Sequence, residues 1–363
     1  MKSKLLFLLL LLGSSYITAQ TVIENPPFET RQGSIHTISK IELSPTETRL
    51  TIRTVFRPQW WTSLDSLTYI YAPESKKQLY PLRIEGRKFG EQVTTPASGI
   101  IEDDCVITYP PLPEGTTRID WMDDNLNSET NTYGILLVKP QETKEQASLR
   151  KIHGNWQQAD AQNGWDIGIY DSLAIMDNRF WKYDLCRKQG KKFKLNLKDE
   201  TGEQCLLEIT QEKDGNLCIG KNGGKANKYI RAGRPQRNYA ATTAATAPQT
   251  AFFRKDTVHI RGFLDGYSPK LGFTTVLIYT DNHITNEGTP AVVTIHPDGR
   301  FESDFVVNYP GVHHLSMGNN WMTFYIRPGE TLMLYINWED HLDYLRQRRL
   351  KPMLTETLYM GPS

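Results

Sequence analysis

The sequence predicts an all-β protein with three small antiparallel β domains, namely a sandwich, a β-meander or small barrel and a second sandwich, followed by a short C-terminal helix. Apolar and polar residues alternate with a period of two in many short segments, and turn-forming residues separate these segments. The 8 Trp and 17 Tyr, together with many β-branched residues, favour strands over helices. A chain of 363 residues is long enough to divide into two or three domains with buried cores.

Residues 1–19 have the pattern of a secretory signal peptide. Lys2 and Lys4 form a positive start, an apolar run from Leu5 to Leu12 follows, and Ala19 offers a small residue at the cleavage site. The run is far shorter than a membrane-spanning helix, and the alternative is a buried N-terminal segment. No cysteine lies near the cleavage site. We therefore expect a periplasmic or secreted chain with no lipid anchor and no membrane span after cleavage.

Residues 20–140 are predicted to form the first β-sandwich. Leu50, Ile52 and Phe56 lie on one face of a half-buried strand because polar residues alternate with them. Proline occurs in most of the connections and no helical period is present, which favours an antiparallel sandwich. Further strands are expected at Leu67–Tyr71, Leu79–Ile84, Cys105–Tyr109, Thr117–Met122 and Tyr133–Val138.

Residues 150–231 are predicted to form an up-and-down β-meander or a small barrel, because hairpin turns join a series of short strands. Gly154-Asn155-Trp156 resembles the signature of lipocalins, in which the tryptophan closes one end of an eight-stranded barrel. The segment is short for a lipocalin, so we favour a packed barrel without a cavity. The expected strands are Ile152–Trp156, Trp165–Tyr170, Ser172–Met176, Phe180–Cys186, Lys192–Leu197, Cys205–Thr210 and Asn216–Ile219.

Residues 232–250 and 251–338 are predicted as a linker and a second sandwich. The linker is rich in Ala, Thr and Pro and lacks the bulky apolar residues that a core needs. In the sandwich, residues 294–305 are expected to form a hairpin that turns at Pro297-Asp298-Gly299. Two later strands show one apolar face each, which consists of Met322, Phe324 and Ile326 in the first and Leu332, Leu334, Ile336 and Trp338 in the second.

Residues 339–351 are predicted as the C-terminal helix. Leu342, Leu345 and Leu350 recur at helical spacing, and acidic residues at the start and basic residues at the end suit the helix dipole. Pro352 ends the helix, and residues 352–363 are expected to form a tail.

Charge and composition exclude several classes of function. Lys+Arg 42 against Asp+Glu 41 leaves a net charge of +1, so no bulk electrostatic argument favours binding to nucleic acid or to an anionic membrane. A mean hydropathy of −0.49 argues against a multi-span membrane protein. No catalytic or phosphate-binding motif is present, and adjacent His313 and His314 point to opposite strand faces, so they cannot share a metal ion. We expect no catalytic residues, no metal and no cofactor, although a site dispersed over the sequence would escape this reasoning.

Two groups of side chains are candidates for a binding site and for disulfide bonds. Exposed tryptophans can stack on sugars or peptides, and the alternative is that they anchor small β cores. Cysteines of an exported protein can form disulfides, and no C-x-x-C spacing is present. The candidate stacking residues are Trp60, Trp61, Trp165 and Trp181. The candidate disulfide residues are Cys186, Cys205 and Cys218, with Cys186 bonded to Cys205 or to Cys218, and the alternative is that no disulfide forms.

Short motifs occur over most of the mature chain. They are VIENPPF at 22–28, FRPQWW at 56–61, GWDIGIYDS at 164–172, FRKDTV at 253–258, IRG at 260–262, DGYSP at 265–269, TIHPDGRF at 294–301, FYIRPGETL at 324–332, YINWE at 335–339 and YMGPS at 359–363. Together they resemble the long N-terminal region of TlpA-like thioredoxin-fold thiol–disulfide oxidoreductases of Bacteroidetes.

In that family a thioredoxin domain with a C-x-x-C motif follows this region. No residue here matches the family's redox cysteines, so none of its functional residues is carried over. We expect either a natural form without the catalytic domain or a fragment of a longer gene product.

The resemblance implies a non-catalytic accessory or recognition region of an envelope thiol–disulfide oxidoreductase, with an unknown protein or glycan partner. The alternative is a periplasmic glycan- or peptide-binding module that uses tryptophan-rich surfaces. A hydrolase with a dispersed site ranks third, because no motif favours it.

Overall fold

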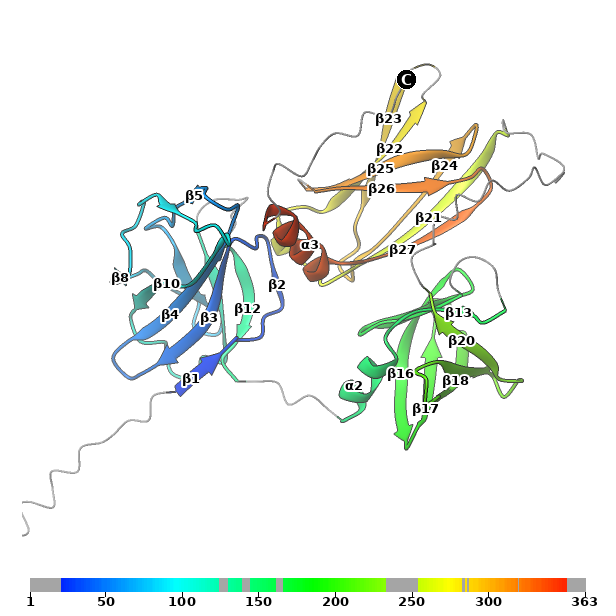
Figure 1. Ribbon diagram of the computed structural model, residues 1–363, viewed down its shortest axis with the longest axis horizontal. Helices are drawn as coiled ribbons and strands as arrows, with labels where there is room; N and C mark the ends of the chain where they lie inside the picture. The colour runs from blue at the N-terminus through cyan, green and yellow to red at the C-terminus, as the bar shows by residue number, and fades with distance from the viewer. Residues whose placement is uncertain are drawn as a thin grey trace, which may run out of the picture. The chain divides into compact units, whose positions relative to one another are not determined.

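The computed structural model describes residues 21–123, 130–138, 144–160, 166–232, 254–282, 285, 287–318 and 320–350. Its contacts divide the chain into two units (Figure 1). The first consists of Met1–Pro140, Gly266–Gly272 and Asn337–Ser363, and the second of Gln141–Asp265 and Phe273–Ile336. Antiparallel sheets, one eight-stranded barrel and a short helix near the C-terminus confirm the predicted all-β class. The predicted signal peptide, linker and tail lie almost entirely outside the described residues.

The first unit contains a sandwich of two five-stranded sheets and a two-stranded ribbon. One sheet has the order β1 (Thr21–Glu24), β3 (His36–Leu43), β4 (Thr48–Val55), β10 (Ile100–Tyr109) and β8 (Arg83–Glu85). The other has the order β2 (Thr30–Arg31), β12 (Thr132–Leu136), β11 (Arg118–Met122), β6 (Tyr69–Ala72) and β7 (Lys77–Leu79). The ribbon pairs β5 (Trp61–Thr62) with β9 (Val93–Thr94).

The core of this sandwich follows the alternation in the sequence. Leu50 and Ile52 of β4 are fully buried, which confirms the half-buried strand predicted there. Trp121 is also buried, and its indole N–H donates to the Tyr109 hydroxyl over 3.0 Å, so the polar atoms of both rings are satisfied. The single strand predicted at Leu79–Ile84 is wrong. Pro81 interrupts it, and the two halves, β7 and β8, belong to different sheets.

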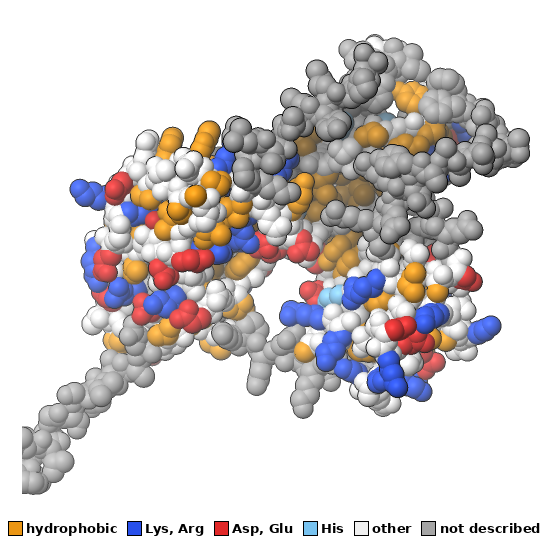
Figure 2. All heavy atoms as spheres, viewed as in Figure 1, with side chains coloured by type: hydrophobic (Ala, Val, Ile, Leu, Met, Phe, Trp, Pro, Cys, Tyr) orange, Lys and Arg blue, Asp and Glu red, His pale blue; other side chains and the backbone are white. Residues whose placement is uncertain are grey.

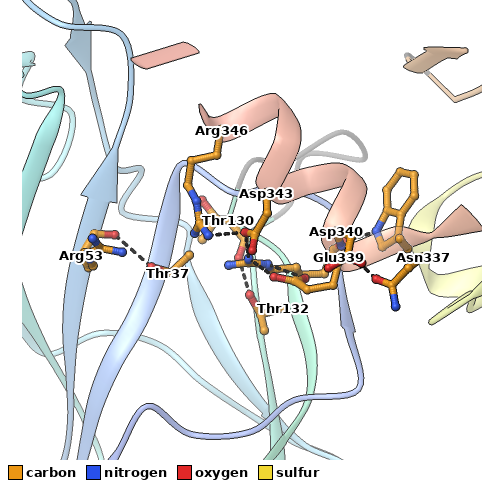
Figure 3. A network of polar contacts seen from close by, with 11 residues as sticks. Thr37, Arg53, Thr130, Thr132, Asn337, Glu339, Asp340, Asp343 and Arg346 are labelled. Atoms are coloured by element: carbon orange, nitrogen blue, oxygen red, sulfur yellow. Dashed lines mark hydrogen bonds and ion pairs between the residues drawn. The ribbon is translucent and has the colours of Figure 1, made fainter. Parts of the chain in front are cut away.

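The helix α3 (Trp338–Leu350) also belongs to the first unit. It begins one residue earlier than predicted because Asn337 caps it: the Asn337 side-chain oxygen accepts from the Asp340 backbone N–H over 2.8 Å. Trp338 is therefore a helical residue that is 3% exposed, and its indole donates to the Arg31 carbonyl over 2.7 Å. Glu339 forms an ion pair with Arg31. Figure 3 shows α3 with Glu339 and with Asp343, which forms an ion pair with Arg346.

The second unit contains a closed barrel. Its strands follow chain order: β13 (Gly154–Gln158), β14 (Ile167–Ile169), β15 (Leu173–Met176), β16 (Arg179–Gln189), β17 (Lys192–Lys198), β18 (Gln204–Gln211), β19 (Leu217–Lys221) and β20 (Asn227–Arg231). The sequence predicted the first seven and missed β20, which closes the barrel by pairing with β13. The short α2 (Lys144–Leu149) and the turn Arg150–Ile152 precede the barrel and contribute Leu149 and Ile152 to its core.

Side chains fill the barrel interior, as expected for eight strands. The buried cluster includes Trp156, Trp181 and Phe193. Trp156 is completely buried, its indole donates to the Ile152 carbonyl over 2.9 Å, and the guanidinium of Arg231 lies 4.8 Å from its ring centroid. Trp156 is therefore an anchor of the barrel core.

The remaining strands of the second unit form a second sandwich. A three-stranded sheet has the order β24 (Arg300–Val307), β21 (Asp256–Asp265) and β27 (Thr331–Asn337), and a four-stranded sheet has the order β23 (Glu287–Thr294), β22 (Thr275–Asn282), β25 (Gly311–Met317) and β26 (Asn320–Ile326). The hairpin predicted around Pro297-Asp298-Gly299 is wrong. The turn forms, but it passes the chain from one sheet to the other, and β24 pairs with β21.

Both faces of β27 are covered, which explains its almost continuous apolar sequence. Met333 and Tyr335 pack with the outward-facing Leu173 of the barrel. The rings of Tyr335 and Tyr170 are stacked, with centroids 3.7 Å apart and an interplanar angle of 6°. The Tyr335 hydroxyl donates to Asp265 over 2.6 Å. Barrel and second sandwich therefore share an apolar contact inside the second unit.

Candidate aromatic binding face

The outer surface of the four-stranded sheet β23–β22–β25–β26 exposes a row of apolar rings and side chains. Residues paired across strands share a face, and Tyr279 pairs with His314, Ser316 with Trp321, and Val312 with Tyr325. Alternate residues of the same strands point inward, and Ile278, Leu315 and Ile326 are buried. We define the aromatic face as Tyr279, Val292, Val312, Trp321 and Tyr325.

Two rings of the aromatic face lie against each other. The centroids of Tyr279 and Trp321 are 5.0 Å apart with an interplanar angle of 27°, so the two rings are stacked against each other, and we call this stacked pair the platform. The platform is open, since Trp321 is 59% exposed and Tyr325, on the same strand, is 53% exposed. Rigid strands hold all three residues. This arrangement offers preformed stacking area at little entropic cost on binding.

A polar pair interrupts the apolar surface of the aromatic face. Thr323 lies between Trp321 and Tyr325 on β26, and its hydroxyl is 3.4 Å from Nδ1 of His314 on β25. Both side chains belong to the same sheet face as the rings. The face therefore combines aromatic area with groups that can donate and accept hydrogen bonds, as small-molecule and glycan sites require.

The first pair of sequence-predicted tryptophans is exposed on a tight turn of the first unit. Trp60 is 49% and Trp61 53% exposed. The turn is fixed by Thr95, whose backbone N–H donates to the Trp60 carbonyl over 2.8 Å, and by a left-handed Gln59 with φ 58°. The Arg57 guanidinium lies 5.1 Å from the Trp60 ring centroid. Trp60 and Trp61 thus remain candidates for ligand contact.

The other two predicted tryptophans do not add to a site. Trp181 is 2% exposed, and its indole donates to the Met176 carbonyl over 3.1 Å inside the barrel. It anchors the barrel core and cannot stack on a ligand, which corrects the prediction for this residue. Trp165 lies outside the described residues.

The predicted disulfide residues form no disulfide bond, and strand register keeps them apart. Cys186 on β16 and Cys205 on β18 flank β17, so two strand spacings, about 10 Å, separate them. Cys218 pairs with Thr210, five residues along β18 from Cys205, a distance of about 17 Å. A disulfide needs Cα atoms within about 7 Å, so this register forms none of the expected bonds.

The environments of the thiols make them poor nucleophiles. Burial raises the pKa of Cys105 to about 12 and raises the pKa of Cys205 above its ordinary value. The pKa of Cys218 is raised because its thiol donates to Glu212, with a smaller contribution from burial. The thiolate is the reactive form in disulfide exchange, so these three cysteines are poorly suited to it.

A buried polar network in the first sandwich has the residue types of a dispersed catalytic site. His36 contacts Thr54 over 2.9 Å and Thr62 over 3.1 Å, and Thr54 donates to Asp104 over 2.6 Å. Because the Thr54 hydroxyl donates its proton to Asp104, it must accept a hydrogen bond from Nδ1–H of His36. Arg87 closes the network with a 2.9 Å ion pair to Asp104. All five side chains are buried, so the network stabilises the sandwich and offers no access to a substrate.

Sequence reasoning missed Trp321, Tyr325 and Tyr279. The signal was present in the sequence: the alternation that assigned Met322, Phe324 and Ile326 to the inner face also assigns Trp321, Thr323 and Tyr325 to the outer face. An outer strand face is expected to be polar, so two large aromatic residues on it indicate a surface with a function.

The comparisons with known proteins leave the family open. No family model and no curated protein matches the chain. A pullulanase from Bacillus acidopullulyticus is among the matching solved structures, with 8% sequence identity and a TM-score of 0.16. The match covers 82% of this chain and 34% of that chain, so this chain spans about a third of the pullulanase, and the TM-score is too low to support any argument. Among the described residues, none of the helices has the length and apolar character needed to span a bilayer.

Proposed function

We propose that this chain is an exported, non-catalytic binding protein of the cell envelope, and that its aromatic face binds a glycan. The observation that carries the proposal is the stacked Tyr279–Trp321 platform on a rigid sheet, in which the Trp321 side chain is 59% exposed. Exposed aromatic area of this kind is unusual on a sheet face that would otherwise be polar.

A glycan suits the aromatic face better than an apolar ligand does. The C–H groups on one side of a pyranose ring carry partial positive charge and are attracted to the electron-rich face of an aromatic ring. The hydroxyl groups at the edge of the sugar need hydrogen-bond partners, and Thr323 and His314 supply them beside the rings. An extended, flat glycan chain could therefore contact Trp321 and Tyr325 in succession along β26.

Intrinsic tryptophan fluorescence measured over a panel of soluble oligosaccharides tests this function. We expect a saturable change with at least one glycan in the wild type and its loss in Trp321→Ala. Trp61→Ala is the matched control because Trp61 is equally exposed but belongs to the first unit. Absence of any response across the panel would remove the proposal.

The second candidate function is a recognition region of an envelope thiol–disulfide oxidoreductase. It is supported by the sequence resemblance and by the lack of a C-x-x-C motif, and the raised pKa values of Cys105, Cys205 and Cys218 make these thiols poor nucleophiles. The test is dithiol-dependent insulin reduction together with binding of an unfolded, reduced polypeptide. We expect binding without catalysis, and measurable insulin reduction by the purified chain would contradict this function.

Export itself is tested by the fate of residues 1–19. We expect the full chain to appear in the periplasm or the medium without these residues, because Lys2, Lys4 and the following apolar run form an export signal. Mass spectrometry of the recovered protein gives its N-terminus. A chain recovered from the cytoplasm with residues 1–19 intact would contradict the proposed location.

A further inference from the structure

The tip of the β16–β17 hairpin concentrates positive charge. Residues 187–194, with the sequence RKQGKKFK, contain five cations and no acid, whereas the whole chain has a net charge of only +1. Figure 2 shows Lys and Arg side chains standing out from the surface of the barrel to which this hairpin belongs. We define the basic tip as Arg187, Lys188, Lys191, Lys192 and Lys194.

The arrangement of the basic tip is electrostatically unfavourable for the protein alone. Arg187 pairs directly with Lys194 across the two strands, and like charges in this position repel. Lys194 has one ion pair, with Glu208 over 2.7 Å. Arg187, Lys191 and Lys192 are exposed and have no ion pair with another described residue.

Acidic residues near the basic tip are occupied by other cations. Glu212 and Asp214, on the next turn of the barrel, both lie within ion-pair distance of Lys228, at 2.8 Å and 3.4 Å. Apart from Glu208, which pairs with Lys194 and also lies in the field of Lys192, these acids do not compensate the charge of the basic tip. Such a cluster is complementary to an external anion, and it gains most from a ligand that presents many negative charges at once.

The shape of the basic tip favours a planar ligand over a thread-like one. The cations surround a tight turn at Gly190, which has φ 62°, and Arg187 and Lys194 lie on the outer barrel surface. Lys188 points to the other side of its strand, where its ammonium group lies 5.2 Å from the centroid of the core residue Phe193. The other four cations of the basic tip are spread around a projecting turn and can approach a flat surface together, whereas a linear polyanion is bound along a groove.

We propose that the basic tip docks the barrel on a bilayer surface of anionic phospholipid. Leu185, which is 38% exposed and precedes Arg187 on the same outer strand face, adds an apolar contact beside the charges. The docking is independent of the aromatic face, which belongs to a different sheet of the second unit.

Vesicle sedimentation tests the docking. We expect the chain to bind vesicles that contain phosphatidylglycerol and phosphatidylcholine, and not to bind vesicles of phosphatidylcholine alone. High ionic strength should release the bound chain. The double variant Lys191→Gln/Lys192→Gln should bind about 30-fold more weakly, because each lysine near an anionic surface contributes a factor of about five.

The matched control is Lys77→Gln/Lys88→Gln, which removes the same charge from exposed positions of the first unit and should bind like the wild type. Far-UV circular dichroism checks that both variants fold. Equal loss of binding in the two variants would show non-specific attraction and overturn the proposal. The proposal would also be overturned if the chain bound soluble dextran sulfate through Lys191 and Lys192 but did not bind vesicles. That result would indicate a soluble polyanion as the ligand.

Discussion

Protonation of His36 should destabilise the first sandwich as the pH falls from neutral into the acid range. The side chain is 3% exposed, and burial lowers its pKa from 6.5 to about 4, with the positive charge of Arg87 as the next contribution. Because the folded-state pKa is the lower one, the stabilisation is complete above the unfolded pKa of 6.5. It is lost progressively as the pH falls towards 4.

The size of the effect follows from these two pKa values. Between pH 7 and pH 5, His36 takes up a proton in the unfolded chain but stays neutral in the folded one. The free energy of unfolding therefore falls by about 2 kcal/mol over this range. The loss reaches about 3 kcal/mol at pH 4. Most carboxylates remain ionised down to pH 5, so the range from pH 7 to pH 5 isolates the contribution of histidine.

Hydrogen exchange of the β3 and β4 amides is the appropriate assay, because it reports opening of this sandwich even when the second unit unfolds separately. We expect the pH dependence to decrease in His36→Gln, which cannot take up a proton in this range, and the remainder to come from groups such as His341, whose pKa burial also lowers. His296→Gln is the control, since His296 is exposed in the fold. An unchanged slope in His36→Gln would refute the assignment of the buried network as the origin of the acid sensitivity.

Three further substitutions or reactions test the packing. Trp156→Ala should destabilise the barrel by about 3–5 kcal/mol, measured by urea unfolding, because it empties a fully buried site. Gly262→Ala should lower the melting temperature of the second sandwich, because its new Cβ would lie 2.0 Å from the ring of Phe301. Phe301 is 1% exposed and therefore has little room to move, and an unchanged melting temperature would contradict this packing. Cys105, whose pKa burial raises to about 12, should resist iodoacetamide at pH 8 in the folded chain and react after unfolding, as peptide mass spectrometry would show.

Local alternation predicted the strands whose two faces differ most. The strand around Leu50 and Ile52 and seven of the eight barrel strands follow this rule. The missed strand β20 (Asn227–Arg231) has polar residues at three of its five positions, so its own sequence does not indicate a strand. It is stabilised by pairing with β13, which closes the barrel.

Long-range pairing accounts for the other errors. The turn at Pro297-Asp298-Gly299 is encoded locally, but whether the chain returns to the same sheet or crosses to another depends on which partner strand is free. The start of α3 was shifted by one residue because Trp338 continues the strand pattern, whereas Asn337 caps the helix.

The candidate site was predictable in type but not in place. An exposed tryptophan was expected, and two of the four named residues, Trp60 and Trp61, are exposed. Burial of Trp181 could not be read from the sequence, because both faces of its strand carry large side chains and only barrel closure decides which one points inward. Trp321 differs, because the alternation of β26 already assigns it to the outer face, and the pairing of β25 with β26 agrees with that assignment.

Titration calorimetry with the best glycan of the panel tests the central claim most directly. The aromatic face predicts that Trp321→Ala weakens binding by about 30-fold, the effect of truncating a central aromatic contact, while Trp61→Ala binds like the wild type. The reverse result, with full affinity in Trp321→Ala and loss in Trp61→Ala, would contradict the assignment of the site to the four-stranded sheet.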